Sequence, residues 1–183
     1  MHLTSSRQGR PITEAELIAQ ARRGLPDALG ALYETHGGAL LRLAARLTGS
    51  NSEAEDLLHD LFVGLPELLG RYEHRAKLDA WLRGVMTRMA IGRMRLLRRT
   101  DVSLDSGENT GLRAPRADPW NSIDLERAIA RLSPTERAAF VLKQLEGYSH
   151  EEIAALLGIS SGASRVRHLR ALRHLRNFLE PEK

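Results

Sequence analysis

The sequence contains no cysteine, only 4% aromatic residues and no long apolar run. Without cysteine, the 183-residue chain can form neither a disulfide nor a thiolate metal site. Arginine and glutamate interrupt its apolar stretches, so none predicts a membrane span, and residues 1–12 lack the apolar core of a signal peptide. These absences predict a soluble cytoplasmic protein that needs no metal or cofactor.

Charge is abundant, and positive charge prevails. Charged residues make up 27% of the chain, the net charge is +4 and the pI is about 9.9, a balance that favours an anionic partner. Apolar residues recur at helical spacing and nowhere sustain the alternation of a strand. We therefore predict an all-α protein.

The segment 100–121 divides the helical pattern into two parts. It is rich in Gly, Pro, Asp, Asn and Ser and has no apolar periodicity, which is typical of a flexible linker. We predict a disordered leader over 1–12, one small helical domain over 13–99, a second over 122–179 and a tail over 180–183. The second domain is expected to be a four-helix unit, with Ser133 opening its second helix through a capping box.

The stretch 149–178 predicts a helix-turn-helix. Ser149 and Glu152 form a capping box, and Gly158 supplies the turn between two amphipathic helices. The second helix should turn one apolar stripe toward the core: Ala171, Leu172, Leu175, Phe178 and Leu179. Its other face suits DNA phosphates, guanine edges and thymine methyl groups, through Arg165, Val166, Arg167, Leu169, Arg170 and Arg173. A solvated basic surface is the alternative interpretation.

Two segments of the first domain carry charge of opposite sign. The helix expected to begin at Ser52 and to close or kink at Pro66 has a polar face of Glu53, Asp56, His59 and Asp60. That face fits a solvated surface or a docking site for a basic partner. A metal site is a third interpretation, but the sequence shows no second cluster of ligands to support it. Residues 71–99 are basic and interleaved with aromatic rings, the composition that grips single-stranded nucleic acid. Trp81 fits a base contact or the core equally well.

Three motifs together indicate a family: AEDLLHDLFVGL at 54–65, WLRGVMTRM at 81–89 and LSPTERAAFVLKQLEGYSHEEIAALLGIS at 132–160. In this order the chain resembles the sigma factors of bacterial RNA polymerase, above all the two-domain extracytoplasmic function (ECF) group of the sigma-70 family. The resemblance covers about residues 14–179. It implies a non-catalytic subunit that binds core RNA polymerase, directs initiation at promoter −10 and −35 elements, and is controlled by an anti-sigma factor.

The resemblance also assigns roles to matching positions. Core polymerase would bind Asp56, His59, Asp60 and Phe62. The −10 element would be recognised and opened by Tyr72, Lys77, Trp81, Arg83, Arg88, Arg93 and Arg95. The −35 major groove would receive Ser161 together with the six residues named above for the second helix of the helix-turn-helix.

Some positions depart from the family pattern. Arg88 and Gly92 stand where the family commonly has Asn and Asp, which predicts a divergent promoter. His168 replaces a usual leucine on the core side of its helix. It is expected either to be a partly buried, hydrogen-bonded histidine or to contact DNA.

Two other functions fit parts of the sequence. A dimeric helix-turn-helix regulator acting without polymerase would explain 149–178, but it leaves the acidic helix and the basic segment without a role. A metal-dependent nuclease could use Glu53, Glu55, Asp56 and Asp60, but no convergent metal cluster or nucleophile–base pair is visible.

Overall fold

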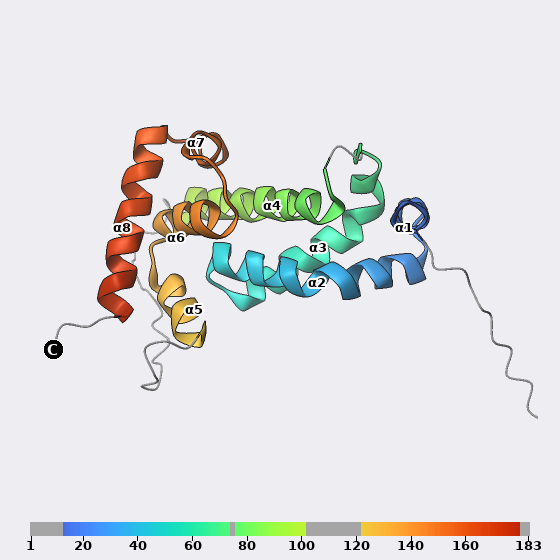
Figure 1. Ribbon diagram of the computed structural model, residues 1–183, viewed down its shortest axis with the longest axis horizontal. Coiled ribbons are helices and arrows are strands. Elements are labelled where there is room, and N and C mark those ends of the chain that lie inside the picture. The colour runs from blue at the N-terminus through green and yellow to red at the C-terminus, as the bar shows by residue number, and fades with distance from the viewer. Residues whose placement is uncertain (1–12, 74–75, 102–121, 180–183) are drawn as a thin grey trace, which may run out of the picture.

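The computed structural model describes residues 13–73, 76–101 and 122–179. Within these ranges it contains helices and no strand, which confirms the all-α prediction (Figure 1). The elements in chain order are α1 (Glu14–Arg22), α2 (Pro26–Thr48), α3 (Asn51–Leu69), α4 (Leu78–Asp101), α5 (Ser122–Arg131), α6 (Pro134–Phe140), the π-turn η1 (Val141–Leu145), α7 (His150–Leu157) and α8 (Ser161–Leu179). The expected leader, tail and nearly all of the expected linker lie outside the described residues.

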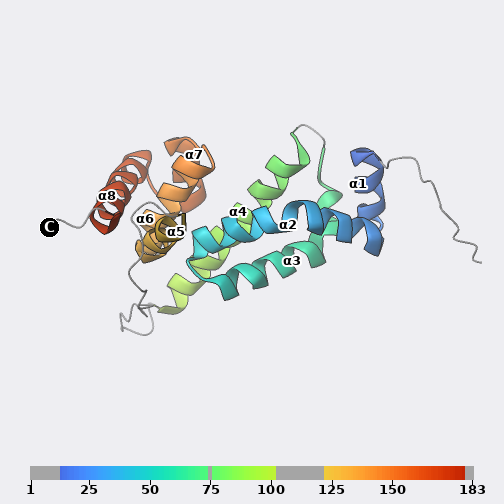
Figure 2. The ribbon, with the colours of Figure 1, turned by 60° about the horizontal axis from the view of Figure 1, so that its bottom comes forward.

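Helices α1 to α4 form the N-terminal unit. The long helices α2, α3 and α4 lie side by side, and α1 lies across one end of them (Figure 2). Their facing sides are lined by fully buried aliphatic side chains, including Leu40, Leu61, Leu82 and Met86. Burying one such side chain stabilises a fold by about 1.5–3 kcal/mol, so this core fixes the relative positions of α3 and α4.

The start and end of α3 differ from the prediction. Ser50, not Ser52, caps the helix, and its hydroxyl accepts the Glu53 N–H at 3.3 Å. Gly49 ends α2 in the left-handed conformation, so the chain turns within two residues and Ser50 is already in the cap position. Pro66 does not close α3, which continues to Leu69. Burial of Leu65 and Leu69 holds the last turn together across the missing proline hydrogen bond.

Helices α5 to α8 form the C-terminal unit, in which the predicted helix-turn-helix is confirmed. The Ser149–Glu152 capping box starts α7, and Gly158 ends it at φ +67°. At α6, proline occupies the first turn as predicted, but the Ser133 hydroxyl donates to the Glu136 carboxylate at 2.7 Å instead of capping the helix backbone.

The apolar stripe of α8 is narrower than predicted. Ala171 and Leu175 are buried and Leu179 is half-buried, whereas Leu172 and Phe178 remain 37% and 41% exposed. The ten-residue α5 lies beside this end of α8 and leaves one side of the stripe exposed (Figure 1). The Phe178 ring instead lies under the Arg131 guanidinium, 5.7 Å from ring centroid to Cζ.

The two units pack against each other around Arg137 of α6. This side chain is 6% exposed, and its guanidinium donates to the carbonyl oxygens of Leu47 (3.2 Å) and Thr48 at the end of α2. It also donates to the carbonyls of Ala130 (3.1 Å) and Leu132 (3.3 Å) at the end of α5. Because helix C-termini carry partial negative charge, the Arg137 cation stabilises the ends of both helices at once. Burial opposes the charged form and lowers the pKa of Arg137.

Candidate nucleic-acid interface

The outer face of α8 is open, as the sequence predicts for a DNA-contacting helix. Val166 and Leu169 are 47% and 61% exposed, and Arg165, Arg170 and Arg173 are exposed around them. Aliphatic groups and guanidinium groups therefore share one surface, which we call the α8 face. Such a surface can meet thymine methyl groups, guanine edges and phosphates.

Local contacts hold the N-terminal end of this face. The Ser160 hydroxyl accepts the Ala163 N–H at 3.1 Å and caps the start of α8, beside half-buried Ser161. Arg165 pairs with Glu151 at 3.1 Å, but both side chains are mostly exposed and such a pair contributes at most about 1 kcal/mol. Phosphate can therefore displace the carboxylate. Ser160 was missed from the sequence, although a serine before the first helical residue is a cap signal.

A histidine cluster supports the α8 face from beneath. His168 is half-buried, with its Nε2 3.1 Å from the Gln144 amide nitrogen and its ring stacked near Phe140. His150 lies 5.6 Å away between ring centroids and bonds the buried Ser164 hydroxyl at 3.0 Å. Burial, followed by the neighbouring His150, lowers the pKa of His168. The alternative of a partly buried, hydrogen-bonded histidine is confirmed, and His168 contacts η1 and α6 from α8.

The acidic face of α3 is open to solvent in the N-terminal unit. Asp56, His59 and Asp60 are exposed, and Phe62 is half-buried with its ring 5.0 Å from that of Tyr33. Val63 is 68% exposed beside them. We call Asp56, His59, Asp60, Phe62 and Val63 the α3 face. Among the described residues no three His, Asp or Glu side chains come together as metal ligands.

Sequence reasoning missed Val63 of the α3 face and its exposed neighbour Tyr33. Tyr33 and Val63 are large, exposed side chains, 51% and 68%, on neighbouring helices. Val63 follows His59 by one helical turn, so its place on the polar side was the available signal. Glu53, in contrast, leaves this face because it pairs with Arg93 of α4 at 3.3 Å.

The structure separates the residues predicted to contact the −10 element into two groups. Lys77 and Arg88 are exposed. Tyr72 is only 4% exposed, donates its hydroxyl to the Ala76 carbonyl and packs 5.1 Å from half-buried Trp81. In this conformation Tyr72 supports Trp81 from below and does not offer its own ring to a base.

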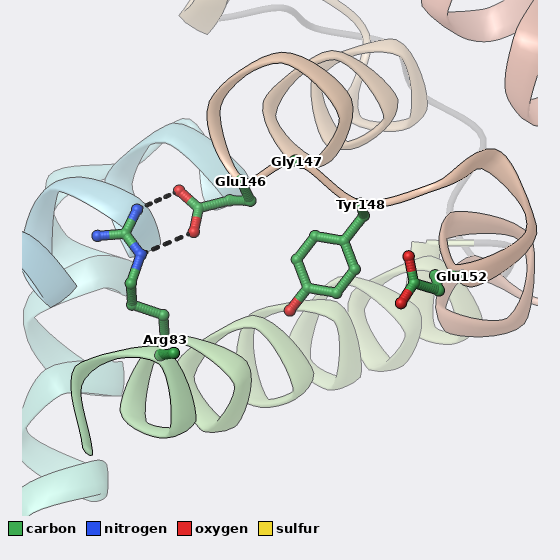
Figure 3. Close-up of a pocket in the computed structure, with 6 residues that line it drawn as sticks. Arg83, Glu146, Gly147, Tyr148 and Glu152 are labelled. Carbon is green, nitrogen blue, oxygen red and sulfur yellow. Dashed lines mark hydrogen bonds and ion pairs between the residues drawn. The ribbon is translucent and has the colours of Figure 1, made fainter. Parts of the chain in front are cut away.

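Arg83 and Arg95 of α4 contact the C-terminal unit. The Arg83 Nε donates to the Glu146 carboxylate at 2.9 Å, and a second guanidinium nitrogen completes a bidentate pair (Figure 3). Beside it a pocket of about 270 Å³ is lined by Tyr148 and Glu152. Arg95 donates to the Leu156 carbonyl in the last turn of α7. Together with Arg93, which pairs with Glu53, three predicted DNA contacts are thus occupied within the chain.

Both units match models of known families. Residues 32–100 match "Sigma-70 region 2" and residues 122–175 match "Sigma-70, region 4". The chain is 35% identical over 162 residues to the RNA polymerase sigma factor CarQ of Myxococcus xanthus, covering 86% of this chain and 92% of that protein. It is 32% identical over 158 residues to the ECF RNA polymerase sigma factor SigL of Mycobacterium tuberculosis, covering 82% and 88%. The chain belongs to the ECF sigma factors.

Solved structures of sigma factors share the fold. The chain is similar to the sigma factor RpoE of Bartonella quintana, solved in complex with the anti-sigma factor NepR, with a TM-score of 0.55, 26% identity and coverage of 80% of this chain and 92% of that one. It is also similar to CnrH, solved with the cytosolic domain of CnrY, with a TM-score of 0.51, 28% identity and coverage of 91% and 97%.

Membership of the ECF sigma factors confirms the resemblance found in the sequence. The family consists of non-catalytic subunits for transcription initiation, which favours this function over the free-standing regulator and the nuclease. None of the helices in the described ranges is both long enough and apolar enough to cross a bilayer.

Proposed function

We propose that this ECF sigma factor binds core RNA polymerase through the α3 face and carries it to promoters through its two DNA-binding units. The observation that carries the proposal is the order of surfaces on one chain: an open acidic α3 face, a basic α4 and a capped helix-turn-helix with an open α8 face. Region 2 and region 4 matches cover the same two units.

The surfaces suit different partners. Asp56 and Asp60 are one helical turn apart and exposed, so both carboxylates can meet one basic surface of the polymerase, with Phe62 and Val63 adding apolar contact. Lys77, Arg88 and the exposed edge of Trp81 suit a single-stranded −10 element. The α8 face suits duplex DNA at the −35 element.

We assign residues 13–99 to polymerase binding and −10 recognition and residues 122–179 to −35 recognition, with 100–121 as the connecting segment. Because one polymerase holds both units, binding of one element raises the effective concentration of the other unit at its own element. Because polymerase performs the chemistry, the sigma factor is itself no enzyme. It acts where the polymerase acts, in the cytoplasm. The neighbour solved with NepR supports control by an anti-sigma factor.

The test uses sigma-free core polymerase and size-exclusion chromatography. Wild type should co-elute with core, and Asp56→Lys/Asp60→Lys should not. The control, Glu34→Lys/Glu67→Lys, makes the same charge change at exposed positions on α2 and the far end of α3, and should co-elute like wild type. Co-elution of the Asp56/Asp60 variant at wild-type level would remove the α3 face from the polymerase contact.

A further inference from the structure

We infer that Arg22 of α1 positions Trp81 for the −10 element, acting through the backbone and the ring of Tyr72. Arg22 is a positioning residue here, and Trp81 is the residue that meets the DNA base. This inference rests on the proposed function for the role of Trp81. The link from Arg22 to Trp81 belongs to the free chain and can be measured without polymerase or promoter.

Arg22 projects from a helix that is firmly held. Ile18 and Ala21 of α1 are 1% and 0% exposed, and a capping box of Thr13 and Glu16 fixes the start of the helix. The helix packs against α3 at the end of the N-terminal unit (Figure 2). The Arg22 side chain therefore reaches α3 from a backbone that the core keeps in place.

The Arg22 guanidinium binds the chain where α3 ends. Its Nε donates to the Leu69 carbonyl at 2.9 Å, and a terminal nitrogen donates to the Tyr72 carbonyl at 2.8 Å. The Tyr72 N–H also donates to the Leu69 carbonyl, at 3.1 Å. The backbone of Tyr72 is thus held on both sides. The rigid fork of arginine matches two neighbouring carbonyls, and its charge strengthens both bonds.

Tyr72 transmits this position to Trp81. The Tyr72 ring is 4% exposed and packs 5.1 Å from the Trp81 ring, and its hydroxyl donates to the Ala76 carbonyl. Trp81 lies near the start of α4 and is half-buried, so part of its indole ring stays open to solvent. A base that stacks on this ring needs the ring in one orientation. Displacing Tyr72 would therefore displace the stacking surface.

The neighbouring Arg23 offers a matched control. It is exposed and carries the same charge, and its backbone N–H, not its side chain, makes the hydrogen bonds that end α1. Within the described part of the chain the Arg23 side chain makes no hydrogen bond. Arg22→Met and Arg23→Met therefore remove the same charge one residue apart, but only Arg22→Met releases Tyr72.

The first measurement follows Trp81 in the free, full-length chain by fluorine NMR. The chain has two tryptophans, so Trp120→Phe leaves Trp81 as the single position for fluorotryptophan. Arg22→Met and Arg23→Met are compared in this background with Arg22→Lys, which keeps the charge but lacks the fork that holds two carbonyls. Far-UV circular dichroism and urea midpoints show that each variant is folded.

Arg22→Met should shift and broaden the Trp81 resonance, Arg22→Lys should change it less, and Arg23→Met should leave it as in wild type. The second measurement titrates holoenzyme onto a promoter fragment whose start site has been mapped, and permanganate detects unpaired thymines. Arg22→Met should co-elute with core polymerase like wild type but need about fivefold more holoenzyme for half-maximal thymine reactivity. That is the result expected when the competent orientation of Trp81 falls to about a fifth of the population.

Four results would count against this inference or its premise. An Arg22→Met resonance identical to that of wild type would overturn the link to Trp81. A changed resonance with wild-type thymine reactivity would overturn its role at the −10 element. Equal losses in Arg22→Met and Arg23→Met would overturn positioning in favour of a simple effect of charge. Thymines that stay unreactive with wild-type holoenzyme would instead strike the proposed function and leave the NMR result intact.

Discussion

Replacing Gly49 by alanine tests the contact between the units beside the buried Arg137 side chain. Gly49 has φ +75°, and a Cβ there would overlap the Arg137 guanidinium. Gly24 is the matched control, since it has φ +72° and nothing lies within 4 Å of its would-be Cβ. Both alanines meet the left-handed backbone strain, about 1–2 kcal/mol. Only Gly49→Ala must also move Arg137.

The additional loss follows from the hydrogen bonds of Arg137. Moving the guanidinium removes its bonds to the Leu47 and Thr48 carbonyls, and each bond to a charged group contributes about 1.5–3 kcal/mol. Partial rearrangement makes a further loss of about 2–4 kcal/mol the expected result for Gly49→Ala over Gly24→Ala.

Urea unfolding followed by far-UV circular dichroism measures the difference. In an Arg137→Lys background, whose shorter, unforked head leaves more room, the loss from Gly49→Ala should shrink toward that of Gly24→Ala. Equal destabilisation by the two glycine substitutions in the wild-type background would refute the argument that the guanidinium fills this space.

Three further predictions concern the helix-turn-helix. Because burial lowers the pKa of His168 in the folded state, the unfolded chain binds more protons, so stability should be level above about pH 7 and fall as pH drops below about 6.5. The urea midpoint of unfolding, measured from pH 8 to pH 5.5, should fall less at low pH in His168→Leu than in wild type. An equal fall in both proteins would show that a group other than His168 causes the pH dependence. Arg170→Ala should weaken binding of a −35 duplex by about 1–3 kcal/mol if it contacts a base; a change in salt dependence without loss of sequence preference would make it a phosphate contact. Ser149→Ala should remove the cap that Glu152 completes and lower stability by about 1 kcal/mol, and a thermal midpoint equal to wild type would show that the cap contributes nothing.

Features that depend on neighbours in the sequence were predicted well. The capping box of α7 and the turn at Gly158 are confirmed, because their partners lie within a few residues. The start of α3 was wrong by two residues, since the choice between Ser50 and Ser52 depends on where Gly49 ends the preceding helix.

Features that depend on distant residues were not predicted. Arg83 reads as a free cation in the sequence, but Glu146, 63 positions away, occupies it. Tyr72 reads as an exposed aromatic among cations, but packing against Trp81 buries it. The contact of Arg137 with the end of α2 could not be predicted from the sequence, because its carbonyl partners lie 89 and 90 positions away. Composition and spacing identify which residues suit DNA, and the packing decides which of them are available.

Transcription in a purified system tests whether the chain directs initiation at promoters. Sigma-free core polymerase is supplied with fragments of the source genome, with and without the wild-type chain, and RNA 5′ ends are mapped. A promoter-specificity subunit should give discrete start sites that appear only with the chain, share upstream −10 and −35 sequences, and disappear with Asp56→Lys/Asp60→Lys. RNA ends that are the same with and without the chain would contradict a promoter-specificity subunit.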